Sequence, residues 1–152
     1  AGEREAAGRY RLLDIARREG MRAMAQTWVQ GMVHPSRLGE RELIDPILDM
    51  FESKSADIYA AQVRALLERP DAAPLLRKIR VPTLLLCGHE DAWSPPQRHL
   101  EMRDLIAGST FVDIPVCGHM STMERPEAVS TALSAWLASV IATESAAPGG
   151  RK

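Results

Sequence analysis

The chain has 152 residues, of which 45% are hydrophobic and 26% charged, a balance typical of a globular domain. Its net charge of −1 gives no electrostatic reason to expect nucleic acid or an anionic membrane as a partner. No apolar stretch approaches the ~20 residues that span a bilayer, and the start of the chain lacks the apolar core of a signal peptide. We therefore expect a cytoplasmic protein that forms one domain or a large part of one.

The first eighty residues are predicted to be helical. Apolar residues recur at intervals of three and four from Tyr10 to Ala16, and again from Met21 to Met32. Ser55 suits the N-cap of a later helix. The inner face of that helix is predicted to consist of Ile58, Tyr59, Val63, Leu66 and Leu67.

The pattern changes after residue 80. The run "VPTLLLCG" (81–88) is short and wholly apolar, which is typical of a strand buried on both faces. "SPPQ" then predicts a helix with Ser94 as its N-cap, and "TFVDIPVCG" (110–118) predicts a second strand. Pro126 is expected to open a last helix. Because a helix joins the two strands, we expect them to be parallel.

The triplet Cys-Gly-His follows each of these strands, and three chemical interpretations are open. Cys87, His89, Cys117 and His119 could bind a metal, but a single glycine between ligands does not match the usual spacing of structural zinc sites. A disulfide between the two cysteines is not expected in a cytoplasmic chain. We therefore expect neither a metal nor a cofactor. The third interpretation is that one histidine belongs to a catalytic triad.

Asp91 and His119 are the candidate catalytic residues. A triad needs an imidazole and a carboxylate that orients it. Asp91 lies just past the first predicted strand and His119 just past the second. Since neighbouring strands are only ~4.8 Å apart, the loops at their carboxyl ends can bring the two side chains together. An acid that precedes the histidine by one crossover helix is the order found in α/β-hydrolases.

These two segments resemble the C-terminal part of an α/β-hydrolase-fold enzyme. In that family G-x-x-D-x-x-x-P carries the triad acid, and a Gly-His turn followed by E-x-P-E carries the triad histidine. The matching residues are Gly88, Asp91, Pro95, Gly118, His119, Glu124, Pro126 and Glu127. The resemblance implies a partial α/β-hydrolase fold of class α/β, with two parallel strands and flanking helices. It implies a helical cap at 1–80 and a core at 81–141. The final segment "ATESAAPGGRK" (142–152) is expected from its composition to be a disordered tail.

The chain departs from this family in lacking a nucleophile. No two glycines are four residues apart, so there is no G-x-S-x-G elbow. Ser94 is better explained as a helix cap, and Ser121 lacks a strand-to-helix turn. We therefore expect this chain to be inactive alone and to be part of a serine hydrolase that acts on a small-molecule ester or lactone. A dehalogenase-like parent with an aspartate nucleophile stays open.

The alternative hypothesis is a non-catalytic module that dimerises or binds a partner. A long apolar strand at a sheet edge invites pairing with another chain. We therefore expect either a homodimer or a complex with the missing N-terminal half. The contact should cover the edge Val81–Cys87 or the stripe Met21–Met32.

Overall fold

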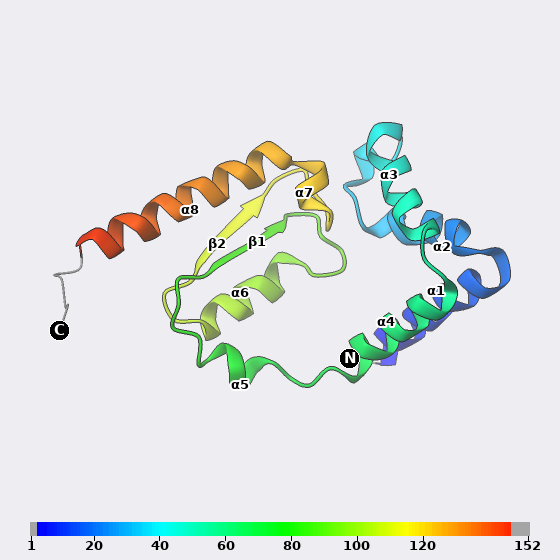
Figure 1. Cartoon of the computed structure of the whole chain (residues 1–152), viewed down its shortest axis with the longest axis horizontal. Helices are drawn as coiled ribbons and strands as arrows, with labels where there is room; N and C mark the ends of the chain where they lie inside the picture. The colour runs from blue at the N-terminus through cyan, green and yellow to red at the C-terminus, as the bar shows by residue number, and fades with distance from the viewer. Residues whose placement is uncertain (1–2, 147–152) are drawn as a thin grey trace. The chain divides into compact units, whose positions relative to one another are not determined.

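The computed structural model describes residues 3–146 and divides after Asp71 into two compact units (Figure 1). The first unit is helical and the second contains both strands. The division falls earlier than residue 80, where the cap segment was expected to end, because the short helix α5 (Ala73–Leu76) belongs to the second unit. No helix within the described residues is long and apolar enough to cross a bilayer.

The helical unit consists of α1 (Glu3–Glu19), α2 (Met21–Trp28), α3 (Arg41–Glu52) and α4 (Ala56–Glu68). Short 3-10 turns at Val29–Gly31 and Pro35–Arg37 connect α2 to α3. Gly20 separates α1 from α2 because its φ of 94° is open to glycine and unfavourable for other residues. Ser55 caps α4 as predicted, since its hydroxyl accepts the N–H of Ile58 at 3.2 Å.

The Met21–Met32 stripe forms part of the core of this unit, so the prediction that it would be exposed is wrong. Met24 is 0% exposed and Met32 is 2% exposed. Met21 and Met24 pack with residues of α1 and α4. The predicted inner face of α4 is correct for Tyr59 and Val63, which are buried, but Ile58 lies on the exposed side. The helices cover the stripe themselves, which leaves it unavailable to a partner.

The second unit is a two-stranded parallel sheet with helices around it, as predicted. Strand β1 (Leu84–Gly88) pairs with β2 (Thr110–Ile114), and α6 (Pro96–Leu105) connects them. The register runs from Leu84 opposite Thr110 to Gly88 opposite Ile114, so both strands end at the same edge. Helices α6 and α8 (Pro126–Ala146) flank the sheet on opposite sides (Figure 1). The short helix α7 (Ser121–Glu124) precedes α8.

Three local predictions for this unit need correction. The side chains of Leu84, Leu85 and Leu86 are only half-buried, so β1 is not buried on both faces. Ser94 does not cap α6, which begins one residue later than expected with Pro95 in the cap position. Helix α8 continues to Ala146, so residues 142–146 are helical rather than part of a disordered tail. The remainder of that predicted tail lies outside the described residues.

Candidate active site

The structure brings Asp91 and His119 into contact. Asp91 follows the end of β1, and His119 follows the end of β2. Because the strands are parallel and end in register at Gly88 and Ile114, their loops leave the sheet side by side. His119 Nδ1 lies 2.8 Å from Asp91 Oδ2, within hydrogen-bond distance. The predicted acid and the predicted base therefore form one pair at the carboxyl edge of the sheet.

Both oxygens of Asp91 are used. Oδ2 faces His119, while Oδ1 accepts the backbone N–H groups of Trp93 at 2.9 Å and Ser94 at 2.8 Å. The side chain is 4% exposed, so these contacts replace the water that the carboxylate loses on burial. The turn that follows β1 thus fixes the direction of the carboxylate before any substrate arrives.

The pair sets the state of the imidazole. A carboxylate can only accept hydrogen bonds, so Nδ1 of His119 carries the hydrogen that Asp91 accepts. In the neutral ring Nε2 is then left with a lone pair. The His119 side chain is 41% exposed, and in the part of the chain that the structure describes Asp91 is its hydrogen-bond partner. The arrangement can take a proton from a group placed beside Nε2.

The serines near the site do not complete a triad. Ser94 donates its backbone N–H to Asp91, and Ser121 begins α7. Within residues 3–146 neither hydroxyl is hydrogen-bonded to His119. The described part of the chain thus supplies a carboxylate and an imidazole, and the sequence provides no G-x-S-x-G elbow.

The residues considered for a metal or a disulfide form neither a disulfide nor a cluster of ligands within the described residues. Cys87 and Cys117 are buried and not joined to each other. Burial, together with the charges of Asp113 and Asp91, raises the pKa of the Cys87 thiol to about 11. His89 is exposed and pairs with Asp113 at 2.7 Å, a hydrogen bond that raises the pKa of His89. No group of three potential metal ligands occurs within the described ranges.

Sequence reasoning missed two carboxylates that hold the His119 loop. Glu90 accepts the backbone N–H of Cys117, and Glu124 accepts that of Gly118. Glu90 is exposed, but its carboxylate is engaged in this bond. Glu124 belonged to the recognised motif without a role. The signal in the sequence was its place in the E-x-P-E motif that follows the Gly-His turn.

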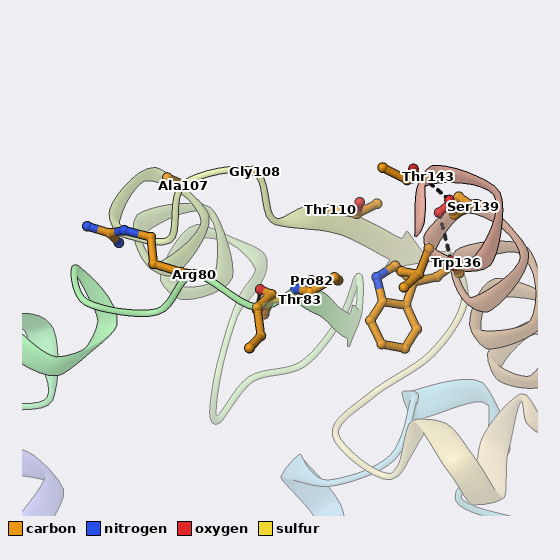
Figure 2. Close-up of a pocket in the computed structure, with 11 residues that line it drawn as sticks. Arg80, Pro82, Thr83, Ala107, Gly108, Thr110, Trp136, Ser139 and Thr143 are labelled. Carbon is orange, nitrogen blue, oxygen red and sulfur yellow. Dashed lines mark hydrogen bonds between the residues drawn. The ribbon is translucent and has the colours of Figure 1, made fainter. Parts of the chain in front are cut away.

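A pocket in the second unit lies at the other end of the sheet (Figure 2). Its lining includes Thr83, which directly precedes β1, and Thr110, the first residue of β2, whereas Asp91 follows a strand end. The hydroxyls of Ser139 and Thr143 also line it, but each donates to a carbonyl of α8, at 2.7 and 2.8 Å. The pocket therefore offers no acid and base that converge, and Asp91 with His119 remains the candidate site.

Comparison with known proteins identifies a family and a partial relative. Residues 2–132 match the model of the alpha/beta hydrolase family. A stretch of 67 residues is 38% identical to a Mycobacterium tuberculosis relative, BpoC, whose name describes a non-heme bromoperoxidase; this stretch covers 44% of the chain and 26% of the relative.

Two solved structures resemble the chain over most of its length. A thermophilic esterase from Thermogutta terrifontis is 35% identical, with a TM-score of 0.81, over 92% of this chain and 52% of that one. An enol-lactonase from Burkholderia xenovorans LB400 is 25% identical, with a TM-score of 0.76, over 85% of this chain and 49% of that one. The chain thus spans about half the length of the two solved enzymes.

Proposed function

Because the chain belongs to the alpha/beta hydrolase family, we propose that it supplies the acid and the base of a serine hydrolase. Asp91 is the acid and His119 the base. The substrate is a small carboxylic ester or a lactone, and the nucleophilic serine comes from a segment outside this chain. The observation that carries the proposal is the 2.8 Å contact between Asp91 Oδ2 and His119 Nδ1 at the carboxyl edge of the sheet.

Support for the substrate class comes from the similar structures rather than from a pocket. One solved structure that matches 92% of the chain is named as an esterase, and another that matches 85% is named as an enol-lactonase. Both names describe attack on an acyl carbon that bears an oxygen leaving group. The Asp91–His119 pair suits this chemistry because it can activate a hydroxyl and later protonate an alkoxide.

The reaction runs in two half-reactions through an acyl-enzyme. His119 Nε2 takes the proton of the serine hydroxyl while the serine oxygen bonds to the substrate carbonyl carbon. The tetrahedral intermediate collapses, the carbon–oxygen bond to the leaving group breaks, and Nε2 returns the proton to that oxygen. Water then repeats the same proton transfers, and hydrolysis of the acyl-enzyme releases the acid. Throughout, Asp91 holds Nδ1–H and stabilises the imidazolium.

The second unit presents a surface that suits the segment with the nucleophile. On α8, Leu133, Leu137 and Ile141 follow each other at intervals of four residues and are 43%, 50% and 61% exposed. Within the described residues β1 pairs only with β2, so its other edge lacks strand partners. Such an edge and such a stripe are typical of surfaces that another part of a fold covers. We propose that the segment carrying the nucleophile covers them.

The same surface would also serve the alternative function, a non-catalytic module that forms a homodimer or binds a partner. Since α8 exposes Leu133, Leu137 and Ile141 in either case, exposure alone does not separate the two functions. What separates them is whether the surface recruits a nucleophile. A catalytic role requires a serine hydroxyl beside His119 Nε2, and a module does not.

The proposal is tested on the DNA upstream of this chain and on any protein in which the upstream frame and this chain are read as one. The upstream frame should contain a strand, a G-x-S-x-G turn and a helix before the present first residue. Trapping the acyl-enzyme and locating the modified residue by mass spectrometry should identify that serine. Asp91→Asn should lower kcat about 10⁴-fold because the histidine adopts the wrong tautomer. Adduct on an aspartate would favour a dehalogenase-like enzyme, and a frame without a nucleophile would refute the proposal.

A further inference from the structure

The turn that carries His119 has an unfavourable backbone conformation. Val116 has a φ of 53°, in the left-handed region. A β-branched residue is disfavoured there because its side chain crowds the backbone. Such a conformation persists only where surrounding contacts hold it, and it is often found at functional sites. The contacts that hold Val116 therefore also determine where His119 lies.

Two carboxylates bind the two N–H groups that directly follow this residue. The N–H of Cys117 donates to Glu90 Oε2 at 2.9 Å, and the N–H of Gly118 donates to Glu124 Oε1 at 2.9 Å. Hydrogen bonds to a carboxylate are stronger than those between neutral groups. In addition, Arg125 Nε donates to the carbonyl of the residue before Cys117 at 2.9 Å. The turn is thus held from both sides.

Glu124 is a buried carboxylate, and the bond to Gly118 is one of the contacts that offset its burial. Its side chain is 3% exposed, on the short helix α7. A buried carboxylate loses its hydration and needs donors in return, whereas an apolar side chain would fill the same space without that cost. The N–H of Gly118, one residue before His119, is such a donor.

Glu90 joins the loop of the acid to the loop of the base. Besides accepting the N–H of Cys117, it donates its own N–H to the carbonyl of Cys117 at 2.9 Å. Glu90 directly precedes Asp91, and Cys117 lies two residues before His119. This pair of bonds therefore fixes the separation of the two loops next to the groups that must meet.

We infer that Glu90 and Glu124 are positioning residues for the Asp91–His119 pair: by binding the N–H groups of Cys117 and Gly118, they hold the strained turn that presents the imidazole to the carboxylate. The inference rests on the proposed function of that pair. Both act through the backbone of the His119 loop.

The test is the tautomer of neutral His119, read from the ring ¹⁵N shifts of the full chain labelled at histidine. In the wild type, Asp91 should hold the Nδ1–H form. Glu124→Leu and Glu90→Ala should shift the population toward Nε2–H, because the ring is no longer held against Asp91. Glu124→Gln should retain the Nδ1–H form, since its amide oxygen can still accept the N–H of Gly118.

Matched controls separate this effect from a general loss of charge. Glu127→Leu and Glu101→Ala remove exposed glutamates and should leave the tautomer unchanged. If Glu124→Leu does not fold, Glu90→Ala decides, because Glu90 is exposed. Wild-type tautomer populations in the folded Glu90→Ala chain, or in folded Glu124→Leu, would overturn the inference. A wild-type chain that already holds Nε2–H would instead refute the pairing itself, and with it the proposed function.

Discussion

Replacing Gly88 by alanine tests how closely the two loops of the site must approach. A Cβ at this position would lie 2.2 Å from the carbonyl oxygens of Cys117 and Gly118, and both of these are backbone atoms that cannot rotate away. To reach an ordinary carbon–oxygen contact, the loops must separate by about 1 Å. Added to the 2.8 Å between Asp91 and His119, that shift would take the pair out of hydrogen-bond range.

The expected cost of Gly88→Ala follows from this overlap. Inserting a methyl group into a closely packed site costs about 1–3 kcal/mol, and a clash with two backbone atoms belongs at the upper end, about 2–3 kcal/mol. For a unit of this size the midpoint of thermal unfolding should fall by about 10–20 °C. Circular dichroism during heating and in urea measures both quantities. Gly39→Ala is the control, because nothing lies within 4 Å of its added Cβ. A Gly88→Ala chain within about 0.5 kcal/mol of the wild type would refute the reasoning.

Three further predictions concern the cysteines, His89 and the apolar surface. At pH 8 a thiol with a pKa of about 11 is only about 0.1% thiolate. Iodoacetamide should therefore label Cys87 at least about a hundredfold more slowly in the folded chain than in urea. Equal rates would show that the thiol is not buried. The bond to Asp113 raises the pKa of His89 above 6.5, so its contribution to stability is present at lower pH and lost as the pH rises through the raised value. The unfolding midpoint of the wild type should therefore exceed that of His89→Ala at pH 5, with a gap that closes in alkaline buffer; a gap that widens instead would contradict this sign. Light scattering of the isolated chain at micromolar concentration should show a dimer or larger assembly. Leu137→Glu should weaken this assembly because it puts a charge on the exposed apolar stripe of α8. A stable monomer would mean that the stripe needs no cover.

The contact between Asp91 and His119 was predictable because local pattern and topology act together. Asp91 and His119 each follow a strand, and a single crossover helix makes the strands parallel, so their meeting at one edge follows from the order of elements. The parallel sheet and the cap of α4 at Ser55 were predictable for the same reason, since each depends on residues close in the sequence.

Contacts between residues far apart in the chain were not predictable. Ser94 has the right side chain for a cap, but its N–H binds Asp91, so the helix begins after it. The carboxylate of Glu90 accepts the N–H of Cys117, which lies 27 residues away in the chain. The periodicity of the sequence does not predict such a bond. The Met21–Met32 stripe was one of two surfaces suggested for a partner, because periodicity gives the apolar face of a helix without showing what packs on it.

The most direct test of the central claim is the hydrolysis of p-nitrophenyl acetate in three samples: this chain alone, the nucleophile-bearing segment alone, and an equimolar mixture. If the chain supplies the acid and the base, only the mixture should turn over the ester, and His119→Ala in this chain should abolish that turnover. Turnover by the chain alone that depends on His119 would contradict the account, because it would require a nucleophile within these 152 residues. A mixture whose components bind each other but whose activity is unaffected by His119→Ala would contradict it equally.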